Sequence, residues 1–127
     1  MQLFASSEKY KGNRDEILKE IHDDLDNGVI SKKINNDKQK IHLEGNNYVE
    51  GRSVLTEEPQ KIVDKYGGTG TMIISGEIWS RKERIVCDEI IGIYVDLEGN
   101  KIPTNKAIIV YSVTGVHVYP RNPGGDL

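Results

Sequence analysis

The sequence has few of the residues on which several classes of protein depend. Cys87 is the one cysteine among 127 residues, so it has no partner for an intrachain disulfide and no cysteine-rich metal site. We expect it to be a small buried hydrophobe on a strand. The longest apolar runs, such as residues 108–111, are far too short to span a bilayer. Residues 1–10 do not combine a basic region with an apolar one, so we expect neither a signal peptide nor a membrane segment.

Positive charge is scarce for a protein that would bind nucleic acid. Lysine and arginine number 17 against 20 acidic residues, which gives a net charge of −3, whereas nucleic-acid-binding proteins usually carry a basic surface. The basic residues gather, however, in two short segments: Lys32, Lys33, Lys38 and Lys40, and then Arg81, Lys82 and Arg84. A locally basic cleft on an acidic body can still bind phosphate.

Several catalytic and ligand-binding motifs are also missing. The segment Tyr66-Gly67-Gly68-Thr69-Gly70 is rich in glycine, but it follows a predicted helix and contains no lysine, so it predicts a cap and a turn instead of a phosphate loop. No Gly-x-Ser-x-Gly elbow is present. The three histidines, His22, His42 and His117, are widely separated and lack carboxylates or cysteines at ligand spacing. We therefore expect no metal and no cofactor, and a solvated or half-buried His22.

The N-terminal half predicts helices. Asn13 and Glu16 form a capping box before residues 14–26, where apolar residues recur at helical spacing, and Asn27-Gly28 is a stop signal. The polar residues 1–12 predict a loosely packed arm. For residues 38–42 the pattern leaves a short helix and a strand open, and Gly45-Asn46-Asn47 predicts a turn.

A second helix is predicted after Thr56. Thr56 is a suitable N-cap, Pro59 is tolerated in the first turn, and Gly67 suits a left-handed C-terminal cap. After this helix the pattern changes to short strands, which we place at residues 71–75, 78–87, 90–96, 106–112 and 116–119. This order predicts an α+β fold, with N-terminal helices packed on an antiparallel sheet of four to five strands. We divide the chain into residues 1–28, an arm and first helix that could be a linker, and a domain at 29–127.

Alternation along a strand predicts which side chains share a face. On the last strand, His117 and Tyr119 face away from the core, while Val116 and Val118 face it. On the long strand, one face carries Trp79, Arg81, Glu83 and Ile85, and the other carries Ser80, Lys82 and Arg84, unless a bulge intervenes. We expect Trp79 to pack in the core or at the edge of the sheet instead of stacking on a base.

The residues suit cleavage of a phosphodiester without a metal. That reaction needs a general base for a ribose 2′-hydroxyl and an acid for the leaving 5′-oxygen. It also needs cations or hydrogen-bond donors around a phosphorane that gains negative charge. Two histidines, lysines and hydroxyls supply these groups, but many domains of this size have the same parts.

Four segments in order carry a resemblance to a known family: Lys38-Gln39-x-x-His42-Leu43-x-Gly45, Tyr66-Gly67-Gly68-Thr69-Gly70, Trp79-x-x-Lys82-Glu83, and Tyr111-Ser112-x-x-Gly115-Val116-His117-Val118-x-Pro120. From about Ile30 to Pro120 the chain resembles the type-50 polymorphic toxin family. That family is a predicted RNase group within the barnase–EndoU–colicin–RelE (BECR) superfamily. It is found at the C-terminal ends of bacterial toxins and of some phage minor head proteins.

The resemblance implies a BECR-like cleft and a metal-independent endoribonuclease used in competition between bacteria. The enzyme would cleave RNA, with transfer RNA as one candidate, by 2′-hydroxyl attack to leave a 2′,3′-cyclic phosphate. His42 and His117 would be general acid and base in an order left open. Lys38 would neutralise the phosphate. Ser112 and Tyr111 would donate hydrogen bonds to it, and Glu83 would orient a partner or act as an alternative base. Further candidates for substrate binding are Lys40, Lys82, Arg52, Ser53 and Thr114.

The chain departs from the family pattern at two positions. Val110 stands where members often have a histidine, and Tyr119 stands where an aliphatic residue is usual. The resemblance also implies an immunity protein, and a monomeric toxin domain delivered as part of a larger protein into the target-cell cytoplasm. The alternative is a non-catalytic RNA- or protein-binding module of a secreted or virion protein. Only the enzyme requires His42 and His117 to lie together at one phosphate.

Overall fold

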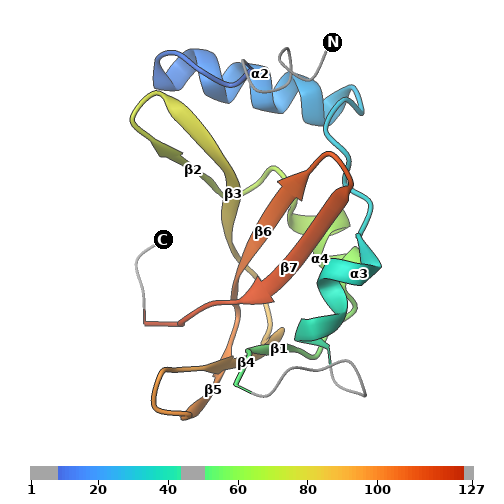
Figure 1. The fold of residues 1–127 in the computed structure, drawn as a ribbon, viewed down its shortest axis with the longest axis vertical. Coiled ribbons are helices and arrows are strands. Elements are labelled where there is room, and N and C mark those ends of the chain that lie inside the picture. The colour runs from blue at the N-terminus through green and yellow to red at the C-terminus, as the bar shows by residue number, and fades with distance from the viewer. Residues whose placement is uncertain (1–8, 44–50, 125–127) are drawn as a thin grey trace.

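A computed structural model describes residues 9–43 and 51–124 of the protein (Figure 1). Its helical elements are α2 (Arg14–Asp26), α3 (Asn36–Gln39), the 3₁₀ turn η1 (Lys40–His42) and α4 (Pro59–Tyr66). Its strands are β1 (Val54–Leu55), β2 (Thr71–Ser75), β3 (Ile78–Val86), β4 (Gly92–Val95), β5 (Lys101–Thr104), β6 (Lys106–Ser112) and β7 (Gly115–Pro120). The predicted α+β class is confirmed, and residues 38–42 are helical. The turn predicted around Gly45 lies outside the described residues, as do residues 1–8 of the predicted arm.

The strands form two antiparallel sheets. The main sheet has the order β2-β3-β6-β7, and a smaller sheet, β1-β4-β5, lies below it in Figure 1. The predicted bounds are correct for β2 and β6 and differ by at most two residues at each end for β3, β4 and β7. The prediction did not include β1 and β5. β1 has only two residues, and Pro103 within β5 cannot donate to a ladder, which weakens the strand signal.

α2 covers one end of the main sheet with the face that its sequence predicts. Ile17, Ile21 and Leu25 are buried, and they belong to the same hydrophobic cluster as the inner face of the sheet. The predicted capping box is present, since the Asn13 side chain accepts from the Glu16 N–H and the Glu16 side chain accepts from the Asn13 N–H. The helix ends at Asp26, as predicted, and His22 is exposed on it.

The segment before α2 packs against the core. Tyr10 is only 4% exposed, its hydroxyl donates to Asp24 at 2.7 Å, and its ring meets the edge of Trp79 with 5.1 Å between centroids. The expectation of a loosely packed arm is therefore wrong for Tyr10. The stretch before α2 has no periodic pattern, so the burial of Tyr10 has no local signal.

α4 begins and ends differently from the prediction. Its N-cap is Glu58 instead of Thr56, and Pro59 opens the first turn as expected. Gly67 is not left-handed, because its φ is −58°, and the positive φ of +91° belongs to Gly68. Gly67 is required for another reason, since a Cβ there would lie 2.7 Å from the Val63 carbonyl oxygen. The glycine at the end of α4 therefore permits a close approach.

Glu83 anchors the loop after α4 to the inner face of the sheet. Its side chain is fully buried, and its oxygens accept from the Gly68 N–H at 3.0 Å, the Gly70 N–H at 2.7 Å and the Tyr111 hydroxyl at 2.6 Å. Between the Ile74–Trp79 and Met72–Glu83 pairs, three residues of β3 oppose one of β2. The bulge adds an even number of residues, so Trp79 and Glu83 stay on the inner face, as the alternation predicts.

Replacing Glu83 should destabilise the fold. Glu83→Gln puts an amide NH₂, which only donates, where an oxygen now accepts from buried N–H or O–H groups. We expect the free energy of unfolding to fall by about 2–4 kcal/mol, measured by urea denaturation. Glu89→Gln, the same change at an exposed side chain, should alter stability by less than about 0.5 kcal/mol. Equal effects of the two substitutions would contradict the role of Glu83.

Candidate active site

The site is built where the short helix α3 meets the edge strand β7. The side chain of Gln39 is 1% exposed. Its Nε2 donates to the Val118 carbonyl oxygen at 2.8 Å, and its Oε1 accepts from the Val118 N–H at 2.7 Å. Upstream, the same edge is paired by the parallel bridge between Ile34 and Val116. Gln39 thus continues the pairing of β7 and fixes α3 at one place along this strand.

This attachment brings the two histidines together. His42 follows Gln39 by three residues, and its ring centroid lies 6.4 Å from that of His117, with an interplanar angle of 8°. The Tyr119 ring lies 5.4 Å from His42 and 6.3 Å from His117. Val118 is fully buried between His117 and Tyr119, so the predicted alternation of β7 is confirmed. Three polar rings from two distant segments therefore form one cluster.

The cluster borders a groove of about 510 Å³. The side chains that line it come from η1, the segment before β1, β4 and the end of β7: Ile41, His42, Arg52, Ser53, Tyr94, His117, Tyr119, Pro120 and Arg121, with Gly51. Two arginines and no carboxylate occur among these lining residues. The groove is therefore locally basic, although the chain carries a net charge of −3.

The tautomer of His42 is set by its surroundings. Its Nδ1 lies 3.0 Å from the carbonyl oxygen of Ser53. A carbonyl can only accept, so Nδ1 carries the proton, and Nε2 of the neutral ring is left as an acceptor. Burial lowers the pKa of His42 most, the bond to Ser53 opposes this, and the charge of Arg52 lowers the pKa further. The neutral ring that results is suited to accept a proton at Nε2.

The cations nearest to His117 come from two other elements. Lys82 on β3, Val110 on β6 and His117 on β7 are directly opposite one another across the sheet, so they share its outer face. Burial lowers the pKa of His117, and the neighbouring His42, Lys38 and Lys82 lower it further. Lys38 and Lys82 are exposed. Lys38 and Lys82 therefore concentrate positive charge around the imidazole of His117.

The remaining candidates on this side lie at the margins of the cluster. Ser112 Oγ donates to the Gly115 carbonyl at 2.8 Å and lies 3.1 Å from Thr114 Oγ1, so both hydroxyls belong to the β6–β7 turn. Ser53 contributes its backbone carbonyl to His42, while its hydroxyl accepts from the Val95 N–H. Lys40 is exposed and lies 4.0 Å from Asp37.

Two predicted site residues lie on the opposite side of the sheet. Tyr111 is 1% exposed and donates to the fully buried Glu83. The pKa of Tyr111 is raised far above its usual value, first by burial and then by Glu83. The structure does not bring either residue to the groove, and both hold the Gly67–Gly70 loop instead.

Sequence reasoning gave no role in this site to Gln39, Tyr94 and Arg121. Gln39 occurs in the opening motif, but its pairing with a strand 79 residues away has no local signal. Tyr94 and Arg121 line the groove from the smaller sheet and from the end of β7. Their approach depends on how β4 packs beside β7, and neither stands in a recognisable motif.

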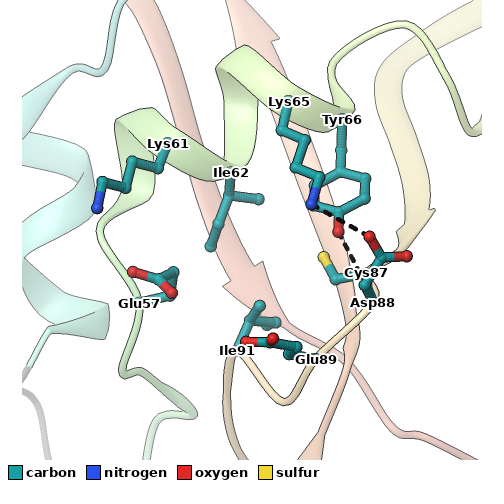
Figure 2. Close-up of a pocket in the computed structure, with 9 residues that line it drawn as sticks. All are labelled: Glu57, Lys61, Ile62, Lys65, Tyr66, Cys87, Asp88, Glu89 and Ile91. Atoms are coloured by element: carbon teal, nitrogen blue, oxygen red, sulfur yellow. Dashed lines mark hydrogen bonds and ion pairs between the residues drawn. The ribbon is translucent and has the colours of Figure 1, made fainter.

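A second, smaller hollow of about 190 Å³ lies beside α4 (Figure 2). Across it, Lys65 bonds to Asp88 at 3.1 Å, and the Tyr66 hydroxyl accepts from the Asp88 N–H at 2.8 Å. Cys87 is 4% exposed, as expected, but it lies one residue past the end of β3 and not on a strand. Burial, and then the charge of Asp88, raise the pKa of its thiol to about 11. A thiol that stays protonated is a poor nucleophile, so we assign these contacts to fastening α4 against the end of β3.

Within residues 9–43 and 51–124, no group of three or more His, Cys, Asp or Glu side chains is placed to hold a metal ion. Over the same ranges, no helix has the length and apolar character needed to cross a bilayer.

Comparison with known families shows to which family the chain belongs. A family model described as bacterial toxin 50 matches residues 34–120, which is most of the chain. The protein belongs to the bacterial toxin 50 family. The match begins just before α3 and ends with β7, so it contains both histidines of the cluster, whereas α2 lies outside it. No curated protein matches the sequence.

Removing the Gln39 amide should loosen both the fold and the histidine pair. Gln39→Ala leaves the buried N–H and C=O of Val118 without partners, so the free energy of unfolding should fall by about 2–4 kcal/mol. In the folded variant, NMR titration should show the pKa values of His42 and His117 moving back up toward 6.5, because each ring becomes better solvated. Asn36→Ala, at an exposed position of α3, is the control. Unchanged histidine titrations in Gln39→Ala would contradict this positioning role.

Proposed function

We propose that this toxin domain is a metal-independent endoribonuclease. The observation that carries the proposal is the meeting of His42 and His117, 75 positions apart in sequence, with 6.4 Å between ring centroids. Both imidazoles are within reach of a single phosphate seated at the groove. The surrounding groups are cations, which suits a reaction that stabilises an anionic phosphorane. A binding module would not need two histidines at one phosphate.

His42 is assigned as the general base and His117 as the general acid. The Ser53 carbonyl holds the proton of His42 on Nδ1, so Nε2 takes the proton of the ribose 2′-hydroxyl. The 2′-oxygen then attacks phosphorus, the bond to the 5′-oxygen breaks, and His117 donates a proton to that oxygen. The products are a 2′,3′-cyclic phosphate and a free 5′-hydroxyl. This assignment is our proposal for the order that sequence alone left open.

We assign Lys38 and Lys82 to stabilising the negative charge of the phosphorane. Both act electrostatically on His117, so a phosphate that contacts this ring is also close to their charges. Arg52 and Arg121 extend the positive charge along the groove, where flanking phosphates would bind. Tyr94 and Tyr119 offer aromatic surface to unstacked bases. Ser112, Thr114 and Lys40 remain candidates for contacts with the substrate at the margin.

The biological setting that we propose rests on membership of the bacterial toxin 50 family. A toxin that cleaves RNA must be restrained in the cell that makes it, so we propose a cognate immunity protein with an acidic surface complementary to the groove. We also propose that the domain is delivered as part of a larger protein and acts as a monomer in the cytoplasm of a competing bacterium. Transfer RNA is one candidate substrate.

Cleavage assays in EDTA test the proposed function. Purified protein should cleave total bacterial RNA with divalent metals chelated, and the cut ends should carry 2′,3′-cyclic phosphates. His42→Ala and His117→Ala should each lower the rate by about a hundredfold or more, since each removes one acid–base group.

His22→Ala is the matched control, because His22 is exposed on α2, away from the groove. It should cleave at the wild-type rate. The proposal fails if wild-type protein leaves all RNA intact while a reference ribonuclease cuts it. Cleavage by both groove variants at the wild-type rate would overturn the assigned residues.

The pH dependence should follow from the lowered histidine pKa values. kcat/KM rises as pH passes the pKa of the base and falls as it passes the pKa of the acid. Both pKa values lie below 6.5 in the free protein, so the maximum should also lie below pH 6.5. Lys38→Ala removes a charge that depresses the pKa of His117, so it should move the descending limb to higher pH. Lys61→Ala, on the opposite side of the sheet, should not move it. A maximum above pH 7.5 would contradict the assignment.

A further inference from the structure

Arg81 holds a backbone conformation that arginine rarely adopts. Its φ is +65°, and it lies in the bulge of β3 between Trp79 and Glu83. Residues other than glycine are strained in this region, and those held there concentrate at functional sites. The Trp79 indole N–H donates to the Lys82 carbonyl at 3.2 Å, which fixes the bulge. The chain therefore places an arginine where glycine would fold with less strain.

The guanidinium of Arg81 borders a hollow of about 400 Å³, the Arg81 pocket, which lies outside the histidine groove. The guanidinium carbon lies 5.2 Å from the Tyr10 ring centroid and 5.7 Å from that of Trp79. The exposed side chains of Val29 and Val113, and the residues Ser31 and Ser112, also line the pocket. A planar cation, apolar side chains and hydroxyls are the groups that stack on a nucleobase and bond to its edge.

The charges near the pocket favour a neutral ring over a phosphate. Lys9, the other cation that lines it, pairs with Asp24 at 3.0 Å, and the same Asp24 oxygen accepts from the Tyr10 hydroxyl at 2.7 Å. A phosphate would meet the negative charge of Asp24 close by. A nucleobase stacked on Arg81 carries no charge and avoids this repulsion.

Neighbouring residues of the main sheet connect the Arg81 pocket with the proposed catalytic His117. Lys82, next to Arg81, is on the same row of the sheet as Val110 and His117. Ser112 is two residues beyond Val110 on β6 and shares its face, which is roughly 7 Å at the usual rise of a strand. In single-stranded RNA the bases can be splayed out from the backbone. A strand held at His117 can thus extend a neighbouring base toward Arg81.

We propose that the Arg81 pocket binds one nucleobase of single-stranded RNA, beside the nucleotide that is cleaved. The proposal rests on the ribonuclease function, because it concerns the same substrate. Stacking on the guanidinium would supply the affinity and would tolerate different bases, since every base has a π-face. The strain at Arg81 is then explained, because the bulge presents the guanidinium to the substrate.

The test combines protein variants with RNAs that lack single bases. Arg81→Gly removes the guanidinium and suits the positive φ, and Val113→Asp adds a charge at a side chain that is 80% exposed. Leu97→Asp, the same kind of change at a fully exposed residue between β4 and β5, is the control. Substrates are a short single-stranded RNA and copies of it that each carry one abasic position.

For the wild type, one abasic position next to the cut should raise KM roughly tenfold, as for the loss of one stacked base. Arg81→Gly should raise KM by a similar factor on the intact RNA. On that abasic RNA, Arg81→Gly and the wild type should have the same KM. Val113→Asp should behave like Arg81→Gly, and Leu97→Asp like the wild type. kcat should change little in every case, because the pocket does not touch the reacting atoms.

The outcomes separate this inference from the proposed function. Suppose that the wild type cleaves RNA, but the increases in KM caused by Arg81→Gly and by the missing base multiply at every abasic position. The base pocket is then wrong, and the ribonuclease stands. If no RNA is cleaved, the same RNAs are compared by equilibrium binding with fluorescence anisotropy. Coupling between Arg81 and one base would then support the pocket and overturn the ribonuclease. If no RNA is cleaved and binding shows no coupling either, both the pocket and the ribonuclease are overturned.

Discussion

The proposed active site depends on the pairing of the Gln39 side chain with the backbone of Val118. A strand at the edge of a sheet leaves N–H and C=O groups that need partners when buried. Gln39 provides one donor and one acceptor in place of a neighbouring strand. Because Val118 stands between His117 and Tyr119, this pairing places His42 beside both rings. The geometry of the histidine pair thus follows from bonds in which neither histidine takes part.

The main sheet separates two kinds of polar chemistry. On its inner face, Glu83 receives donors from a glycine loop and from Tyr111, all within the core. On its outer face, imidazoles and cations gather where solvent and a ligand can reach them. The sign of the net charge therefore says little about what the protein binds, because the local arrangement of charge determines the field at the groove.

The electrostatics of the free site also favour an anionic ligand. Burial and neighbouring positive charge make protonation of His42 and His117 unfavourable, which is why both pKa values are lowered. A phosphate at the groove would offset this repulsion and stabilise the protonated ring that donates to the leaving group. Burial, which is the largest cause of the lowered pKa at both rings, and the charges of Arg52, Lys38 and Lys82 thus favour both an anionic ligand and acid–base chemistry at this groove. This agrees with a toxin family and with the proposed cleavage of RNA.

The sequence by itself determined the features that depend on neighbouring residues. The capping box and stop of α2, the bounds of β2 and β6, and the outward direction of His117 and Tyr119 all follow from local caps and periodicity. Alternation also assigned Glu83 to the face of Trp79 and Ile85. Only the tertiary structure decided that Glu83 meets Tyr111 in the core, that Tyr10 is buried, and that His42 lies beside His117. These contacts join residues far apart in the chain, so they depend on how α3, the bulge of β3 and β7 pack together.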